Sequence, residues 1–220
     1  MSAQGFAFER RFGFIMSKLK EALEPEGWVF LIHDEQAIRD FFKEQSLNGV
    51  DHMLQIQDPD GEQCVFFIQE KWKLVTNQRE VSQFLDCCAR ILARMPDYKG
   101  DIYRLWVSRT VPSLNGEKSL QEGQCIVVQT CTSQTILFVN ALLVICDILD
   151  CRDKALEIVK TIGSLLPNQE EAIVDPKVAA AAAAAAAEAP QTTFEPVSDF
   201  GEKRVLPITN KTVVMVRKVD

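Results

Sequence analysis

The fold is decided by the stretch Val50-Asp-His-Met-Leu-Gln-Ile56, the turn Asp58-Pro-Asp-Gly61 and the stretch Val65-Phe-Phe-Ile-Gln-Glu-Lys-Trp72. Both stretches are rich in the β-branched, aromatic and other apolar residues that strands favour. Asp-Pro-Asp-Gly is a strong turn signal, because aspartate and proline suit the early turn positions and glycine accepts a positive φ. Together the three segments predict a β-hairpin.

Side chains of the second strand are expected to alternate between the two faces of the sheet. Gln69, Lys71 and Lys73 should therefore share one face, while Glu70 and Trp72 share the other. In a register shifted by one residue, Glu70 would occupy the first face and Lys71 would leave it. We expect the first register.

Helical and strand patterns flank this hairpin on both sides. Apolar spacing predicts helices at residues 6–24, at 35–45 after a cap at Asp34, from a cap at Asn77 or Thr76 to near Pro96, at 134–149, and after Arg152 to Leu166. Buried strands are predicted at 28–32, 102–107 and 124–129. This order of elements indicates an α/β fold in which helices pack on the faces of a sheet.

The chain divides by composition into a domain and an arm. Residues 1–166 carry the apolar pattern of a folded domain, whereas residues 167–204 are rich in Ala and Pro and include nine consecutive alanines. This segment is expected to be a linker or a non-globular arm. Residues 205–220 contain the β-branched run Thr212–Val216, which we expect to add as a strand to a sheet edge. A protein partner or a neighbouring subunit is therefore expected to contact residues 167–220.

The charge balance limits how the protein could bind nucleic acid. The 220 residues are 47% hydrophobic and 25% charged, and the net charge is −7. Phosphate binding relies on Lys and Arg, so this balance excludes a broad basic surface and leaves room only for local contacts.

Cysteine usage and the apolar runs bear on the compartment. The seven cysteines are odd in number and form no C-x-x-C pair, so we expect reduced thiols in the cytoplasm or nucleus. The longest apolar run, from Thr135 to Leu149, is too short to span a bilayer. We therefore expect no membrane partner.

Three residues of the hairpin match the needs of phosphodiester cleavage. Such cleavage requires an acid that holds a divalent cation, a second oxygen ligand, and a positive group that stabilises the phosphate charge. Asp51 opens the first strand, and Gln69 and Lys71 close the second. The hairpin would bring all three together.

This pattern resembles the Mrr-type branch of the restriction-endonuclease-like, or PD-(D/E)xK, nucleases. The shared features are an Asp entering a strand, a turn, and an apolar strand that ends in Gln-x-Lys before an aromatic residue. Gly5-Phe-Ala-Phe-Glu9 is also similar to the Gly-x-x-Phe-Glu opening of that branch, in which the Glu reaches back to the metal cluster. The sequence departs from the pattern at Val50, where the branch has Pro, at Glu70 inside Gln-x-Lys, and in an extra helix at residues 34–46.

The resemblance covers roughly residues 4–150 and implies a restriction-endonuclease-like mixed central sheet flanked by helices. It implies a DNA endonuclease or resolvase-like enzyme that uses Mg²⁺ or Mn²⁺. The implied roles are metal binding by Asp51, Gln69 and Glu9, catalysis by these three with Lys71, and substrate binding by Lys73 and His52.

Each of these residues also has a structural interpretation. Asp51 could cap a turn, Lys71 and Lys73 could protect a strand edge, Glu9 could interact with the helix dipole, and His52 could pair with a neighbouring carboxylate. The alternative function is a structural or interaction protein that keeps the nuclease fold without its chemistry, for instance in a DNA-virus particle. The acidic net charge, the weak ligand Gln69 and the long arm favour this virion alternative.

Overall fold

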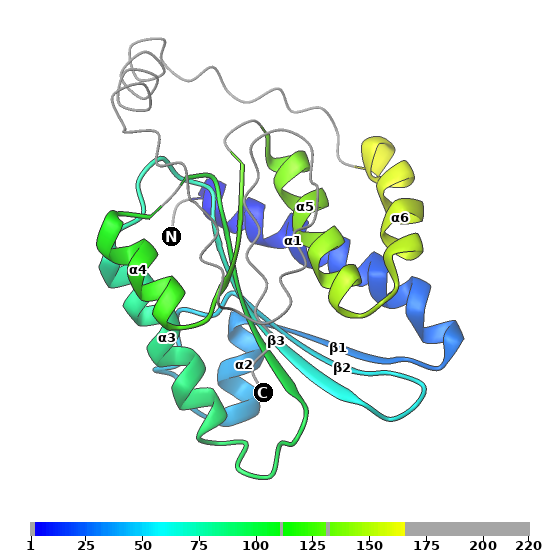
Figure 1. Cartoon of the computed structure of the whole chain (residues 1–220), viewed down its shortest axis with the longest axis horizontal. Coiled ribbons are helices and arrows are strands. Elements are labelled where there is room, and N and C mark those ends of the chain that lie inside the picture. Colours follow the sequence, from blue (N-terminus) through cyan, green and yellow to red (C-terminus); the bar gives the residue numbers. More distant parts are fainter. Residues whose placement is uncertain (1–2, 111, 131–132, 166–220) are drawn as a thin grey trace, which may run out of the picture.

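A computed structural model describes residues 3–110, 112–130 and 133–165 of the chain, and the side chains of those among them from 7 to 161 (Figure 1). The predicted arm at 167–204 and the predicted strand-forming segment at 205–220 lie outside this range. The described residues form an α/β fold with one mixed, five-stranded sheet flanked by helices.

The strands lie in the sheet in the order in which they occur along the chain. They are β1 (Val29–Asp34), β2 (His52–Gln57), β3 (Gln63–Lys71), β4 (Asp101–Ser108) and β5 (Ile126–Gln129). Strand β2 is antiparallel to both of its neighbours, β1 and β3. Strands β3, β4 and β5 run parallel to one another. The predicted hairpin is confirmed as β2 and β3, and Gly61 at its turn has a φ of +91°.

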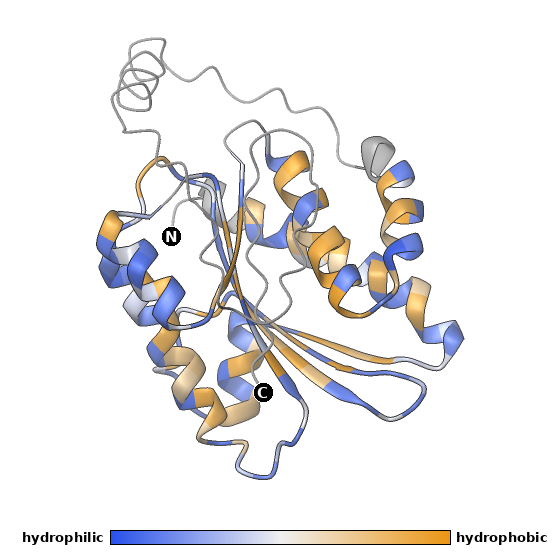
Figure 2. Cartoon of the chain, viewed as in Figure 1, coloured by the Kyte–Doolittle hydropathy of each residue, from blue (hydrophilic) through white to orange (hydrophobic). Residues whose placement is uncertain are grey.

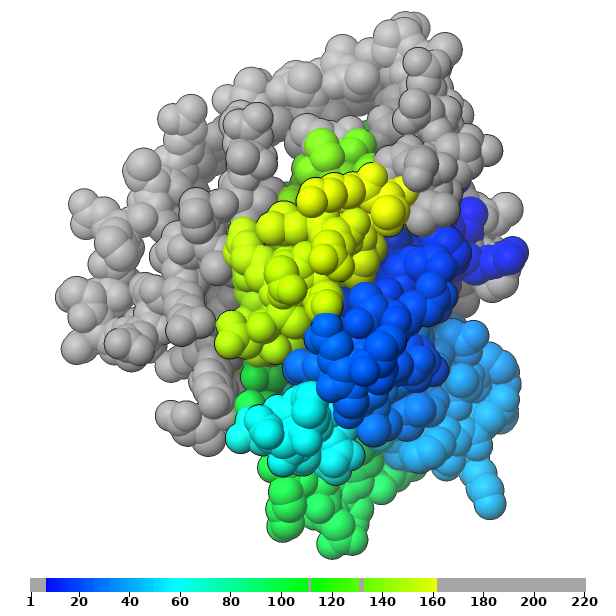
Figure 3. Space-filling view, turned by 90° about the vertical axis from the view of Figure 1, so that its right-hand side faces the viewer, coloured from blue at the N-terminus to red at the C-terminus, as the bar shows by residue number. Residues whose placement is uncertain are grey.

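Helices cover both faces of the sheet (Figure 1). One face carries α1 (Ala3–Leu23), α5 (Gln134–Ile148) and α6 (Arg152–Leu165); the other carries α2 (Glu35–Phe42), α3 (Gln78–Leu92) and α4 (Leu114–Glu122). A short 3₁₀ turn, Glu24–Glu26, ends α1. Figure 3 shows α6 lying along α1 on the outside of the first layer.

Two hydrophobic clusters hold these layers together. The first joins α1, α5 and α6 to the sheet through buried side chains that include Phe8, Phe12 and Phe138. The second joins α3 to the opposite face around Phe67, Phe84 and Trp106. Figure 2 shows hydrophobic residues along the strands and in α5. Burying a large apolar side chain contributes about 1.5–3 kcal/mol, so the two clusters are the main source of stability.

Local capping chemistry fixes where the helices on the second face begin. Asp34 accepts a hydrogen bond from the Ala37 backbone N–H at 2.7 Å and caps α2 as predicted. Asn77, not Thr76, caps α3 and forms a capping box with Glu80. These caps place the first turns of both helices next to the ends of β1 and β3.

The structure differs from the sequence predictions at two helices. Helix α2 ends at Phe42 instead of Gln45, because Lys43 adopts a left-handed conformation with a φ of +52°. Helix α4 was not predicted at all. It buries only Gly116 and Leu120 and begins at a Ser113 cap, so it has almost no apolar periodicity to detect.

No helix among the described residues is both long and apolar enough to cross a membrane. The described cysteines are free thiols: Cys64, Cys87, Cys88, Cys125, Cys146 and Cys151.

Candidate functional site

The carboxyl ends of the three parallel strands define one edge of the sheet, and Asp51 lies at this edge directly before β2. Ligands bind to open α/β sheets mostly outside such strand ends. The Asp51 N–H donates to the Ile68 carbonyl at 2.8 Å, which fixes the residue against the end of β3. The side chain of Asp51 is 6% exposed.

One oxygen of Asp51 gathers three donors from β3. Its Oδ2 accepts hydrogen bonds from the Gln69 Nε2, from the Glu70 backbone N–H at 2.7 Å and from the Lys71 Nζ at 3.5 Å. The side chains of Asp51, Gln69 and Lys71 therefore converge, as the strand alternation predicted. The shifted register is wrong, because Glu70 contributes only its backbone here.

Glu9 reaches the same edge from the first turns of α1. Burial and, second to it, the negative charge of Asp51 raise its pKa to about 7, although Lys71 acts to lower it. These electrostatic interactions indicate that Glu9 faces the region of Asp51 and Lys71, and its role as a metal ligand stays a prediction.

Glu35 is a site residue that the sequence interpretation missed. Burial raises its pKa, and Asp51 raises it as well, whereas the ion pair with Arg39 at 2.7 Å lowers it. Glu35 follows β1 directly, and Asp34 lies opposite His52 in the β1–β2 ladder. The antiparallel register thus brings Glu35 beside Asp51. Pairing the predicted strands in register would have indicated this neighbour.

His52 and Glu70 form a buried pair on the α1 face of the sheet. The His52 Nδ1 lies 2.6 Å from the Glu70 Oε1, and both side chains are almost fully buried. The other ring nitrogen faces α1, since a Cβ on Gly13 would lie 2.9 Å from the His52 Nε2. The imidazole is thus paired with a carboxylate, but the partner is Glu70 and not the adjacent Asp51. This placement favours a positioning role over the predicted contact with substrate.

The charges of this pair are strongly coupled. Burial raises the pKa of Glu70 to about 7. Burial alone would lower the pKa of His52, but the adjacent Glu70 raises it above the usual value. Each group thus favours the charged form of the other, and their hydrogen bond holds both side chains in place.

Lys73 lies outside the convergent group. Strand β3 ends at Lys71, so the alternation that was expected to place Lys73 on the same face does not extend to it. Its Nζ forms an ion pair with Glu80 in the first turn of α3. A role of Lys73 in substrate binding stays a prediction.

The donor set fits Mg²⁺ or Mn²⁺ in chemical type. Asp51, Glu9 and the Gln69 carbonyl offer the oxygen ligands that these cations prefer. Among the described residues no three His, Cys, Asp or Glu side chains gather closely enough to hold a metal ion by themselves. Mg²⁺ often uses only one or two carboxylates and completes its shell with water and substrate phosphate. The Gln69 amide presents its nitrogen to Asp51, so ligation would require it to turn over.

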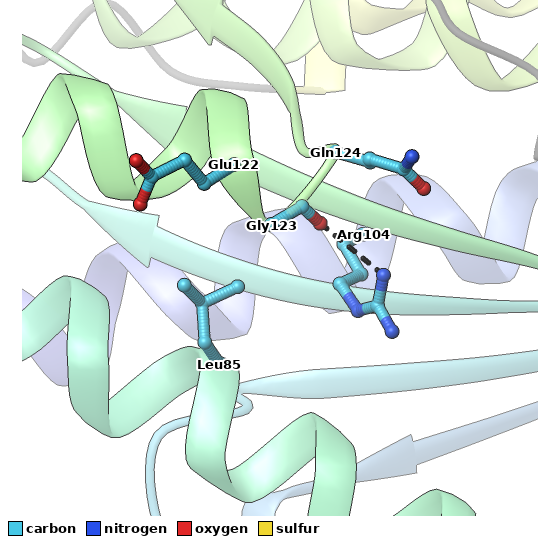
Figure 4. A pocket seen from close by; sticks show the side chains of 5 residues that line it. All are labelled: Leu85, Arg104, Glu122, Gly123 and Gln124. Carbon is cyan, nitrogen blue, oxygen red and sulfur yellow. Dashed lines mark hydrogen bonds between the residues drawn. The ribbon is translucent and has the colours of Figure 1, made fainter.

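A hollow lies away from this edge. It has a volume of about 280 Å³ and is lined by Leu85, Arg104, Glu122, Gly123 and Gln124 (Figure 4). The Arg104 Nη1 donates to the Gly123 carbonyl at 3.2 Å, and Glu122 adds a carboxylate. The hollow gathers no group of side chains typical of catalysis.

Comparisons with protein-family models, with curated proteins and with solved structures found no match to this chain. The function must therefore be inferred from the chemistry of the residues around Asp51.

Replacing Glu9 by glutamine should remove the destabilisation that ionised Glu9 causes at higher pH. The pKa of Glu9 in the folded state, about 7, exceeds its ordinary value of 4.5, so ionisation of Glu9 weakens folding as the pH rises between these values. Glu9 is half-buried, so solvent screening reduces the effect. At pH 8, Glu9→Gln should increase the free energy of unfolding by about 1 kcal/mol, which raises Tm by about 2–4 °C. Below pH 4.5 the two proteins should melt alike. Equal melting curves from pH 4 to 8 would contradict the placement of Glu9.

Proposed function

We propose that this protein is a metal-dependent nucleic-acid phosphodiester hydrolase, an Mrr-like DNA endonuclease or a resolvase-like enzyme. The observation that carries the proposal is the convergence of Gln69 and Lys71 on one oxygen of Asp51. Three residues that are up to 20 positions apart in sequence meet at the end of a hairpin, which supports the proposal.

The fold supports a restriction-endonuclease-like assignment. The elements α1, β1, the β2–β3 hairpin, α3 and β4 follow one another in the order expected from the resemblance, with α2 as an extra helix before the hairpin. Helix α3 begins beside the same strand edge, because Lys73 pairs with Glu80 in its first turn. Helix N-termini favour phosphate through their free N–H groups and dipole. At α3 the Asn77 side chain already accepts the Glu80 N–H and Glu80 adds a negative charge, so the positive charge at this edge comes from Lys71 and Lys73.

Hydrolysis of a phosphodiester joins a water oxygen to phosphorus and breaks the bond to the leaving sugar oxygen. Asp51, Gln69 and Glu9 would hold Mg²⁺ or Mn²⁺. When bound, the cation supplies positive charge at the phosphate and lowers the pKa of a water molecule. Lys71 would orient the attacking water or stabilise the charge that develops on the phosphate oxygens. The hydrogen bonds of Asp51 to Ile68 and Glu70 keep the carboxylate fixed during this step.

Cleavage of supercoiled, linear and branched DNA, and of RNA, tests this function. The intact protein should cut one of these substrates with Mg²⁺ or Mn²⁺ and lose the activity when EDTA removes the cation. Asp51→Asn should lower cleavage by at least about 100-fold, because the amide keeps the shape of the side chain but not its charge. Failure of the intact protein to cut any substrate with either cation would reject the hydrolase function.

A second candidate function, an interaction protein that retains the fold without the chemistry, is favoured by the free edge of β1. Within the described residues β1 pairs only with β2, and it presents Val29 and Leu31 with 51% and 47% of their surfaces exposed. Phe41 of α2 is 56% exposed and contacts His33 of β1. Charged side chains or prolines commonly protect such edges, but the middle of β1 has neither.

If this edge pairs with the edge of a second copy, Leu31→Lys should weaken the association. Lysines on an edge strand oppose edge-to-edge pairing, and like charges from the two copies would face each other across the new ladder, so the dimer should weaken by at least about tenfold in Kd. Light scattering at increasing protein concentration measures the association. Lys118→Glu on the exposed surface of α4 serves as the control. A monomeric wild-type protein at high concentration would rule out this pairing.

A further inference from the structure

Arg109 lies beside the candidate catalytic lysine on the neighbouring strand. It directly follows β4, and its backbone N–H donates to the Lys71 carbonyl at 2.9 Å. Adjacent strands are about 4.8 Å apart, so the backbones of the two residues are neighbours at the strand edge. Their side chains leave on opposite faces of the sheet, Lys71 on the face of Gln69 and Arg109 on the face of Trp72.

An aromatic stack fixes the guanidinium of Arg109. Its central carbon lies 5.1 Å from the centre of the Trp72 ring. Trp72 stacks on Phe8 at 5.7 Å, and Phe8 stacks on Phe138 at 4.7 Å. The last two rings belong to the core between α1, α5 and the sheet, so the tryptophan plane is fixed. A guanidinium on such a plane is oriented before any ligand arrives.

The guanidinium of Arg109 has no acceptor among the described residues. Lys71 is paired with Asp51 and Lys73 with Glu80, whereas Arg109 has no carboxylate within 4 Å among the described residues. Its Nε is buried and has no hydrogen-bond partner in this part of the chain. Buried donors without a partner are costly and rare. The stack on Trp72 explains the position of the side chain but satisfies none of its N–H groups.

We infer that Arg109 binds a phosphate group of the nucleic-acid strand, next to the phosphate that is cut. This inference rests on the proposed function and assigns a substrate-binding residue to the same site. A planar guanidinium donates two parallel hydrogen bonds to phosphate oxygens, which a lysine cannot do. A nucleic-acid strand carries one phosphate per nucleotide, so Lys71 would contact the phosphate that is cut and Arg109 a neighbouring phosphate of the same strand.

Binding measurements without cleavage test the inference. A fluorescently labelled DNA oligonucleotide is titrated with the full-length protein in Ca²⁺, which replaces Mg²⁺ without the same catalysis, over a range of salt concentrations. Arg109→Gln should weaken Kd by about tenfold and reduce the slope of log K against log salt by about 0.9, the value for one lost phosphate contact. Arg109→Lys should recover the salt slope but only part of the affinity.

Lys99→Gln is the matched control, because Lys99 is exposed and lies before β4, at the opposite end of that strand. It should change neither Kd nor the slope. If Arg109→Gln and Lys99→Gln behave alike while the intact protein cleaves DNA, the inference fails and the hydrolase function stands. If Arg109→Gln weakens binding but no protein cleaves, the phosphate contact stands and the hydrolase function fails. Absence of binding by the intact protein would overturn the inference.

Discussion

Lys71→Ala is expected to reduce metal-dependent DNA cleavage by about 10²–10³-fold while leaving the stability of the fold almost unchanged. The Lys71 Nζ lies 3.5 Å from the Asp51 Oδ2 at the strand edge, where it would face charge that develops only in the transition state. Removal of one such electrostatic contact typically costs this much in rate. The lysine is only partly buried, so its loss leaves no cavity. The measurements are kcat/KM with Mg²⁺ and the midpoint of thermal unfolding.

Lys118→Ala provides the control for Lys71→Ala, since Lys118 is an exposed lysine of α4 that pairs only with Glu122. It should match the wild type in both rate and Tm. Lys71→Arg should keep part of the activity because it keeps the charge but changes the position of the donors. Wild-type turnover in Lys71→Ala would remove the lysine from the mechanism.

Glu70→Leu is expected to destabilise the protein by about 3–5 kcal/mol, because it leaves His52 buried without its partner. For a chain of this size such a loss lowers Tm by roughly 10 °C. The His52 Nδ1 and the Glu70 Oε1 are 2.6 Å apart, and neither side chain has access to bulk water that could replace the hydrogen bond. Thermal and urea unfolding at pH 7 measure the effect.

A double-mutant cycle separates this pairing from simple packing. His52→Leu should also be destabilising, but the double variant with Glu70→Leu should lose much less than the sum of the two single changes. Two apolar residues can replace a buried polar pair at little cost, whereas one cannot. Additive losses would show that the two side chains contribute independently.

The local parts of the fold and site could be predicted from the sequence. The turn at Asp58–Gly61 and the apolar alternation of the two strands determine the hairpin, and the hairpin alone brings Asp51 to Gln69 and Lys71. These signals lie within about twenty residues of one another. Most helices were also predicted, because their apolar spacing is regular.

The missed features depend on contacts between distant segments. Glu35 becomes a neighbour of Asp51 only through the pairing of β1 with β2, and no pattern around Glu35 itself indicates it. The partner of His52 is Glu70, which lies across the ladder and was considered only as a register alternative. Helix α4 depends on packing against α3 and has little apolar periodicity. The roles of Glu9 and Lys73 in binding remain predictions for the experiments above.

Gly13 occupies a position in the interior of α1 where glycine costs about 1 kcal/mol relative to alanine. The absence of a side chain there allows the helix to approach the imidazole of His52, since a Cβ would come within 2.9 Å of the Nε2. Glu9 lies four residues earlier, about 6 Å along the helix axis. The distance between α1 and β2 therefore also determines how strongly Glu9 is shielded from water and how close it is to Asp51. A substitution at Gly13 would displace the helix and so change the acidity of a carboxyl group that the new side chain never touches. The working pH of the protein could thus be adjusted by helix position alone, with every residue at the strand edge unchanged.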